Sequence, residues 1–212
     1  MEGLLRRPEP SKTRYSDLSG SGRRLFLARH GVTEENLRGE IQGHRPGTLA
    51  REGRRWAEET GRRLRGEGVA RIYASDLARA LETARLMARA MGGTEVLPEP
   101  LLRERGYGDL EGRTKAQVKL DYPDFYSIDM AECGVEPLAS VFERLEKFLA
   151  KIRNDGSSTL LVVAHGGTNS YLTNLLLREG RVMHPAHNEV SCFRLDGGGR
   201  VVEHIPAWDG RR

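Results

Sequence analysis

Two short apolar runs, each ending in a histidine and a glycine, constrain the fold of this chain more than any other feature. The first run, Leu25–Ala28, leads into Arg29-His30-Gly31, and the second, Leu160–Ala164, leads into His165-Gly166-Gly167. A short apolar run bounded by glycine predicts a buried strand, so each histidine is expected where a strand emerges into a loop. Ligands of open α/β sheets bind at that carboxyl edge, and the two histidines therefore predict one shared site.

Helical and strand patterns alternate along the rest of the chain. Apolar residues at helical spacing predict helices over residues 49–65, 77–91, 138–152 and 166–178, and a strand is predicted over residues 71–74. Two β-rich runs flank a glycine-rich turn, which predicts a hairpin of residues 191–195 and 201–205. This alternation predicts a three-layer α/β/α fold, with a mostly parallel central sheet and helices on both faces.

The chain is expected to hold one folded domain. Residues 1–22 are polar, contain proline and glycine and lack core periodicity, so they are expected to form a flexible extension. Residues 23–212 are expected to form a single domain with a small cap segment near residues 113–137. The aromatic side chains of that segment either touch the substrate or pack against each other. Three polar residues ahead of the hairpin are expected to be structural: His184, His187 and Asn188.

Composition excludes several classes of protein. The 212 residues, 38% of them apolar, suffice for one α/β core, and no stretch approaches the ~20 apolar residues that cross a bilayer. Without an apolar signal region at its amino terminus, the chain is expected to be cytoplasmic and not to bind a membrane. Its net charge of +4 comes from basic residues interleaved with acids, which predicts solvated surfaces and no nucleic-acid partner. Two isolated cysteines, Cys133 and Cys192, are expected to be buried free thiols.

The residues around the first histidine suit phosphate chemistry. Arg29 supplies a planar fork of donors for phosphate oxygens, and Gly31 lets the backbone approach a ligand closely. A neutral imidazole at His30 can attack phosphorus and form a phosphoramidate that water later hydrolyses. A single histidine at a strand end is more often a packed residue than a catalyst, but a second such strand end favours catalysis.

Five blocks of the sequence, in this order, resemble the histidine phosphatase superfamily, the phosphoglycerate-mutase-like group. They are Arg29-His30-Gly31, Asn36 with residues 42–44, residues 75–84, residues 102–112, and His165-Gly166-Gly167. The resemblance covers residues 25–195 and implies the phosphoglycerate-mutase-like version of the α/β/α fold.

The resemblance also implies a role for each matching residue. His30 would be the nucleophile, and Arg29, Arg79 and His165 would bind the phosphoryl group. Glu104 would protonate the leaving oxygen, because a departing alkoxide is a poor leaving group. Further contacts to the substrate are expected from the same blocks: Thr33, Asn36, Gln42, Gly43 and Gly166.

These roles predict a phosphomonoesterase that hydrolyses a small phosphorylated metabolite through a phosphohistidine, without a cofactor or a metal. Only 61 positions (165 − 104 = 61) separate Glu104 from His165, whereas the mutase branch inserts a larger segment there, so hydrolysis is favoured over transfer. Phosphoryl transfer of the cofactor-dependent phosphoglycerate mutase type stays the alternative. A non-catalytic phosphate-binding module is a second alternative. A metallohydrolase is disfavoured, because neither histidine has a further ligand at metal-binding spacing. A homodimer stays open.

Overall fold

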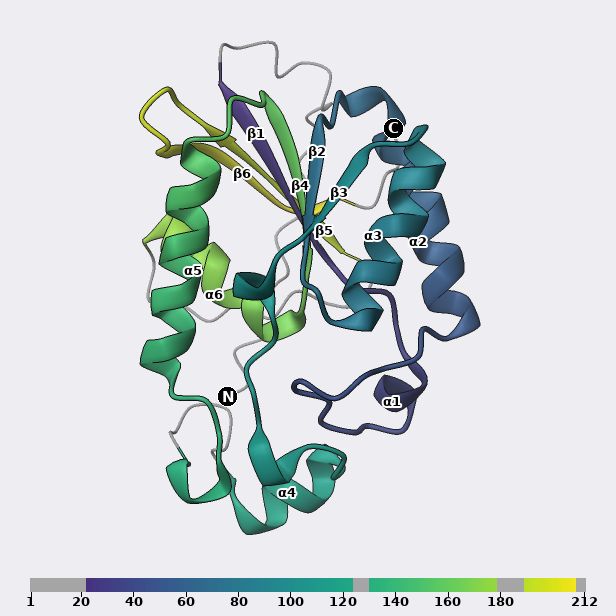
Figure 1. Cartoon of the computed structure of the whole chain (residues 1–212), viewed down its shortest axis with the longest axis vertical. Coiled ribbons are helices and arrows are strands. Elements are labelled where there is room, and N and C mark those ends of the chain that lie inside the picture. Colours follow the sequence, from purple (N-terminus) through teal and green to yellow (C-terminus); the bar gives the residue numbers. More distant parts are fainter. Residues whose placement is uncertain (1–21, 124–129, 179–188, 209–212) are drawn as a thin grey trace, which may run out of the picture.

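The computed structural model describes residues 22–123, 130–178 and 189–208. A six-stranded sheet in the order β3-β2-β4-β1-β5-β6 lies at its centre (Figure 1). The first four of these strands run parallel, β5 pairs antiparallel with β1, and β6 pairs antiparallel with β5. The strands are β1 (Arg23–Arg29), β2 (Arg71–Ala74), β3 (Glu95–Pro98), β4 (Thr159–Ala164), β5 (Val190–Leu195) and β6 (Val201–Trp208).

Helices cover both faces of this sheet, as the sequence predicts. In Figure 1, α2 and α3 lie on one side of the strands, and α5 and α6 lie on the other. The three-layer α/β/α fold with a mostly parallel sheet is therefore confirmed. The helices are α1 (Glu34–Leu37), α2 (Arg51–Leu64), α3 (Ala78–Met91), α4 (Lys115–Asp121), α5 (Leu138–Arg153) and α6 (Gly166–Leu177).

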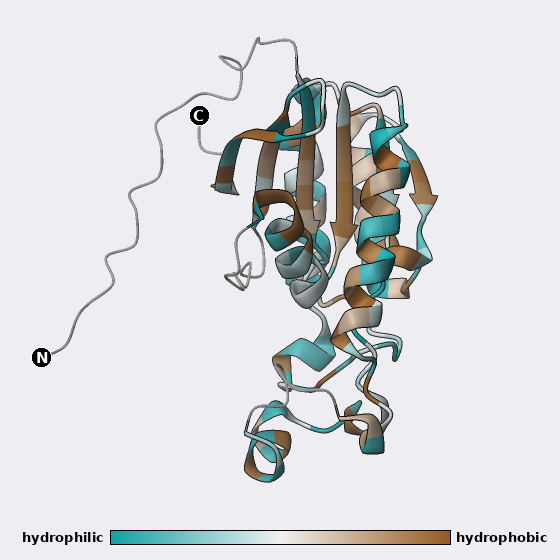
Figure 2. Cartoon of the chain, turned by 90° about the vertical axis from the view of Figure 1, so that its left-hand side faces the viewer, coloured by the Kyte–Doolittle hydropathy of each residue, from teal (hydrophilic) through white to brown (hydrophobic). Residues whose placement is uncertain are grey.

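Strand β1 shows how the sheet separates two cores. Successive side chains of a strand point to opposite faces. Leu25 and Leu27 accordingly pack in the cluster that contains Phe148 of α5, whereas Phe26 packs in the cluster that contains Trp56 of α2. All four side chains of Leu25–Ala28 are buried, so the run is continuously apolar in the sequence. Figure 2 shows the strands at the centre of the sheet largely in brown.

A third, smaller apolar cluster lies beyond the carboxyl edge of the sheet. It joins both ends of the expected cap segment to the loop around Tyr107, and an isolated bridge between Glu40 and Thr114 connects the same region to the loop after α1. Figure 2 shows this lobe, with α4, standing apart from the sheet. Its buried members are Ile41, Tyr107, Leu110, Val118, Met130, Cys133 and Val135.

Most expected elements are found within two residues of their predicted limits. The sequence does not predict the short helices α1 and α4 or the strand β3, and β6 continues three residues beyond its predicted limit. β3 is an edge strand of four residues with no fully buried side chain, so it lacks an apolar signal. Cys133 and Cys192 are buried free thiols, as expected. Residues 1–21 of the expected extension lie outside the described residues, as do His184, His187 and Asn188.

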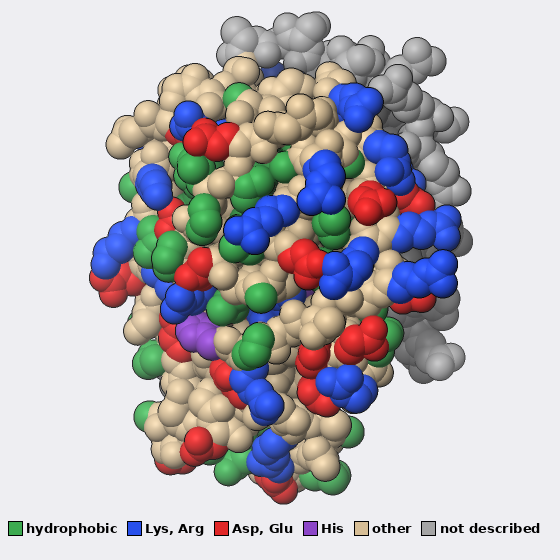
Figure 3. Space-filling model, turned by 45° about the vertical axis from the view of Figure 1, so that its right-hand side comes forward, with side chains coloured by type: hydrophobic (Ala, Val, Ile, Leu, Met, Phe, Trp, Pro, Cys, Tyr) green, Lys and Arg blue, Asp and Glu red, His purple; other side chains and the backbone are tan. Residues whose placement is uncertain are grey.

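The surface of the helical layer formed by α2 and α3 carries charges of both signs. Figure 3 shows basic and acidic side chains intermingled on this side of the molecule, and pairs such as Arg55–Glu59 lie one helical turn apart. This is the solvated, mixed-charge surface that the sequence predicts. Within the described ranges, no helix combines the length and the apolarity that a membrane crossing requires.

Candidate active site

Three neighbouring strands bring the candidate residues to one edge of the sheet. His30 follows β1, His165 follows β4 and Ser75 follows β2, and the three strands are adjacent and parallel. Backbone hydrogen bonds continue past the strand ends, from His30 N to Ala164 O (2.9 Å) and from Ser75 N to Val163 O (3.0 Å). The rings of the two histidines lie 5.2 Å apart between centroids. The parallel register of β1 and β4 thus places both histidines side by side.

A backbone carbonyl fixes the tautomer of His30. Its Nδ1 lies 2.8 Å from the carbonyl oxygen of Gly31, which can only accept a hydrogen bond. Nδ1 therefore carries the proton, and in the neutral ring the lone pair is on Nε2. The side chain is 2% exposed, so this orientation is held within a packed environment. Nε2 is the atom of His30 that can act as a nucleophile.

His165 is fully buried and neutral. Burial lowers the pKa of its imidazole well below the usual value, and the positive charge of Arg79 lowers it further. Its Nε2 lies 2.8 Å from the hydroxyl oxygen of Ser75, while Nδ1 has no hydrogen-bond partner among the described residues. When the Ser75 hydroxyl donates to Nε2, the proton of His165 is on Nδ1, where it can be donated to a ligand.

Arg79 holds the loop after α1 and keeps one edge of its guanidinium available. The side chain is 1% exposed, Nη1 donates to the carbonyl of Arg45 (2.9 Å), and Nη2 donates to the carbonyl of Gly43 (2.8 Å). Nε is buried and has no partner in the described part of the chain. Burial lowers the pKa of Arg79 to about 10, so the group stays positively charged at neutral pH. A buried cation with an unused donor is a site for an anion.

Gly43 and Gly166 provide space that a side chain would fill. Gly43 has a φ of +49°, and a Cβ atom there would lie 1.9 Å from the carboxylate of Glu111. A Cβ atom on Gly166 would lie 3.0 Å from the Arg29 guanidinium carbon, so this glycine lets Arg29 approach the amino terminus of α6. Both glycines thus position other groups of the site: Gly43 the carbonyl that accepts from Arg79, and Gly166 the Arg29 guanidinium.

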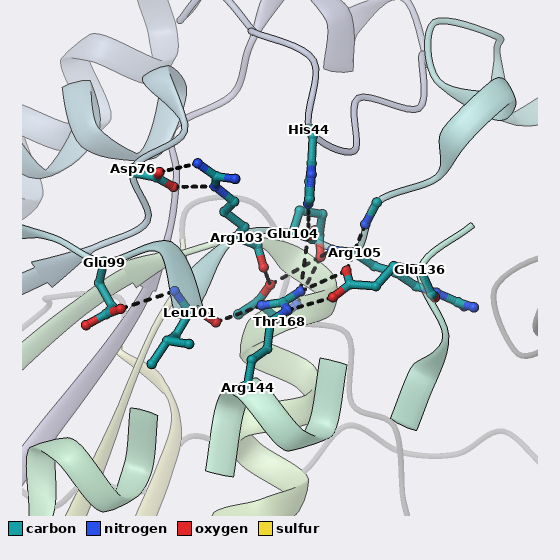
Figure 4. A network of polar contacts seen from close by, with 11 residues as sticks. His44, Asp76, Glu99, Leu101, Arg103, Glu104, Arg105, Glu136, Arg144 and Thr168 are labelled. Atoms are coloured by element: carbon teal, nitrogen blue, oxygen red, sulfur yellow. Dashed lines mark hydrogen bonds and ion pairs between the residues drawn. The ribbon is translucent and has the colours of Figure 1, made fainter. Parts of the chain in front are cut away.

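Glu104 is anchored at the start of α6, directly after His165 (Figure 4). Its carboxylate accepts hydrogen bonds from the backbone N–H groups of Gly167 (3.2 Å), Thr168 (3.1 Å) and Arg105 (3.1 Å). The Thr168 hydroxyl lies 2.9 Å from the carbonyl of Arg103 and 3.3 Å from the Glu104 carboxylate. Free N–H groups of a helix start favour this position for a carboxylate. The carboxyl group expected as the acid therefore lies beside the second histidine.

The remaining predicted contacts lie in the loop between β1 and α2. Thr33 and Asn36 form a reciprocal capping box at α1: Asn36 N donates to the Thr33 hydroxyl (3.1 Å), and Thr33 N donates to the Asn36 amide oxygen (3.2 Å). Thr33 is fully buried in this role. Gln42 is 8% exposed, and its buried Oε1 has no partner among the described residues. Besides the two donors Arg79 Nε and His165 Nδ1, the candidate site therefore contains one buried acceptor without a described partner, Gln42 Oε1.

The comparison with known proteins agrees with this geometry. A profile of the histidine phosphatase superfamily, branch 1, matches residues 25–206. The chain belongs to that superfamily. As a histidine phosphatase superfamily enzyme, it is expected to act on a phosphorylated substrate, and the residues gathered at the sheet edge are those that carry the family resemblance.

Relatives within the superfamily include mutase-like and phosphatase proteins. The chain is 32% identical over 195 residues to phosphoglycerate mutase-like protein 4 of Arabidopsis thaliana, covering 87% of this chain and 84% of the relative. It is 31% identical over 162 residues to an adenosylcobalamin/alpha-ribazole phosphatase of Salmonella typhimurium, covering 73% and 79%. The structure of a mycobacterial glucosyl-3-phosphoglycerate phosphatase in complex with VO3 superimposes with a TM-score of 0.76 at 25% identity, covering 88% and 100%.

The structure adds residues to which the sequence assigns no role. Ser75 contacts His165, and Thr168 contacts Glu104. Lys115, the first residue of α4, is an exposed residue whose ammonium group lies within electrostatic range of Arg29 and Glu104. Nearby protein atoms partly bury the ammonium group, which lowers its pKa; the charge of Arg29 lowers the pKa further, and the charge of Glu104 opposes the shift. These residues have no sequence signal of their own, because only the folded chain brings them to His30 and His165.

Proposed function

We propose that this chain hydrolyses phosphate monoesters of small metabolites through a phosphohistidine formed on Nε2 of His30. The observation that carries the proposal is the pair of buried, unpartnered nitrogen atoms, Arg79 Nε and His165 Nδ1, next to the nucleophile. Burying polar groups without partners is costly, so their persistence favours a ligand that accepts hydrogen bonds from both. A phosphoryl group, with about two negative charges near neutral pH, supplies such acceptors.

The first chemical step transfers the phosphoryl group to the enzyme. The lone pair on His30 Nε2 forms a bond to phosphorus while the bond from phosphorus to the ester oxygen breaks. A proton carried by Glu104 passes to that oxygen, so the alcohol leaves neutral. Arg29, Arg79 and His165 stabilise the negative charge on the phosphoryl oxygens, which donors already held in place by the fold can do without reorganising.

The second step regenerates the enzyme. A water molecule attacks the phosphohistidine, the Glu104 carboxylate takes its proton, and the bond from phosphorus to Nε2 breaks to release inorganic phosphate. The cationic side chains would then do what a metal does in other phosphatases. Among the described residues, no group of three or more His, Cys, Asp or Glu side chains is placed to hold a metal ion.

A mutase of the phosphoglycerate type is the second candidate, because it would use the same first step. The name of the Arabidopsis relative favours it, whereas the Salmonella and mycobacterial relatives are phosphatases. Between the acid loop (residues 102–112, which include Glu104) and residue 123, the structure has one α-helix of seven residues, Lys115–Asp121. This short helix supports a small cap that leaves the phosphohistidine accessible to water. The positive charge of Lys115, within electrostatic range of Arg29 and Glu104, supports a substrate that carries a second anionic group.

The test is a panel of phosphorylated metabolites, with phosphate release and isomer formation both measured. We expect phosphate release from the full-length protein and an acid-labile phosphate on the enzyme after brief incubation with labelled substrate. His30→Ala should remove both signals, because it deletes the nucleophile. Isomer formation without phosphate release would instead identify a mutase, and turnover by His30→Ala within tenfold of wild type would refute the assignment of His30.

A further inference from the structure

One side chain outside the predicted set connects the loop held by Arg79 to the loop that carries Glu104. His44 lies in the loop after α1, and its Nε2 is 2.8 Å from the backbone carbonyl oxygen of Glu104. Because that oxygen can only accept, Nε2 is the donor. Figure 4 shows the imidazole pointing at Glu104 from the opposite side to Arg144.

We propose that His44 is a positioning residue, which fixes the acid loop relative to the phosphate-binding arginine. The inference rests on the proposed function, since it concerns the placement of Glu104 as the acid. His44 would not touch the substrate or the reacting atoms. It would act through the backbone of Glu104, by connecting the loop after α1 to the acid loop, 60 residues further along the chain.

The two loops are held together by several contacts centred on His44. Its backbone N–H donates to the carboxylate of Glu111 (2.9 Å), which also accepts from the backbone N–H of Tyr107 (2.9 Å). On the other side, the carbonyls of Gly43 and Arg45, which flank His44 in the chain, accept from Arg79. The Arg79 guanidinium is therefore connected to the backbone of Glu104 through the backbone of residues 43–45 and the side chain of His44.

In the described part of the chain, the Glu104 carbonyl accepts from one donor besides His44, and the two donors connect it to different parts of the fold. Arg144 Nη2 lies 3.3 Å from this oxygen, and its other contacts are to Leu101 O (2.7 Å) and the Glu136 carboxylate. Arg144 thus connects Glu104 to α5, whereas His44 connects it to the loop after α1 that Arg79 holds. The ring also lies 3.5 Å from the position of a Cβ atom at Gly106, so it packs against the loop it holds.

The proposed role of His44 depends on its hydrogen bond to Glu104 and not on the charges around the ring. It lies within electrostatic range of Asp76 and Glu136, and each carboxylate has its own arginine partner, Arg103 and Arg144. The Nε2 proton is present in the imidazolium and in the neutral tautomer with Nε2–H, so the bond to Glu104 survives in both. What the geometry requires is a donor at the position of Nε2.

Three substitutions separate this role from a general loss of structure. The amide nitrogen of glutamine reaches the position of the histidine Nε2, whereas that of asparagine reaches only the position of Nδ1. We expect His44→Ala and His44→Asn to lower kcat/KM for an alkyl phosphate by about tenfold, and His44→Gln to stay within about threefold of wild type. An aryl phosphate, whose leaving group needs no acid, should change by less than about threefold in all three variants.

The outcome is read from this pattern, with thermal unfolding showing that each variant is folded. Equal losses for alkyl and aryl phosphates, or a His44→Gln variant as slow as His44→Ala, would overturn the proposal. Inactivity of the wild type towards every phosphate would refute the proposed function instead. NMR of the neutral His44 ring would then test the positioning role. A proton on Nε2 would support it, together with amide shifts of residues 104–106 that His44→Gln preserves and His44→Asn changes. A neutral ring with its proton on Nδ1 would overturn it.

Discussion

Replacing Gly167 by alanine should displace the acid without weakening the fold. A Cβ atom on Gly167 would lie 2.6 Å from the Glu104 carboxylate oxygen, whereas ordinary contacts of a Cβ atom begin near 3.4 Å. The carboxylate must therefore move by about 0.8 Å and give up hydrogen bonds to the start of α6. A misplacement of about 1 Å in a reacting group can cost ~10²-fold in rate. We expect kcat/KM for an alkyl phosphate to fall by about 10- to 100-fold, or ~1.4–2.7 kcal/mol.

The stability of Gly167→Ala should not fall together with its activity, so a loss of turnover could not be attributed to unfolding. Gly167 is the second residue of α6, and alanine is favoured over glycine in helices by up to about 1 kcal/mol. The thermal midpoint should therefore stay equal or rise while turnover falls.

The matched control is Gly156→Ala, because nothing lies within 4 Å of a Cβ atom at that exposed glycine. It should leave activity unchanged. The assay compares an alkyl and an aryl phosphate, and the aryl phosphate should lose less than about threefold. A Gly167→Ala enzyme with wild-type turnover of the alkyl phosphate would show that the carboxylate position seen here does not matter for the reaction.

Three further results are expected. Glu104→Gln should slow alkyl phosphate turnover by ~10²- to 10⁴-fold, with a much smaller effect on an aryl phosphate; equal losses would exclude Glu104 as the acid. Excess EDTA should leave activity unchanged, and recovery of a lost activity by added zinc or magnesium would favour a metallohydrolase. Because burial lowers the pKa of His165, the unfolded chain gains a proton below about pH 6.5 that the folded chain does not, so the free energy of unfolding should fall with acidification there. In denaturant titrations at pH 7 and pH 5, this loss should be smaller for His165→Asn, and an equal loss would contradict the assignment.

The sequence predicts the sheet and its functional edge because the relevant signals are local. Apolar runs that end in His30 and His165 identify β1 and β4, and Leu77–Met91 identifies α3 by its helical period. The geometry of the site depends on contacts across the chain that no local pattern encodes. Arg79 bonds to carbonyls 34 and 36 residues away, and Glu104 bonds to N–H groups 63 and 64 residues away. Any residue type presents a backbone N–H or carbonyl, apart from the missing N–H of proline, so these partners leave no trace in composition or spacing.

Arg79 and His165 explain why we expect this site to favour an anion over a neutral ligand. Burial lowers the pKa of His165, and the charges of Arg79 and Arg29, which also repel each other, lower it further, so the imidazole is neutral beside two cations. An anion that binds there relieves this repulsion and accepts the hydrogen bonds that Arg79 Nε and His165 Nδ1 lack. A neutral ligand of the same size would supply acceptors but leave the repulsion in place. We therefore expect relief of this repulsion to contribute to phosphate binding. Vanadate or phosphate, if it binds there, should raise the unfolding temperature, because a ligand of the folded state stabilises it.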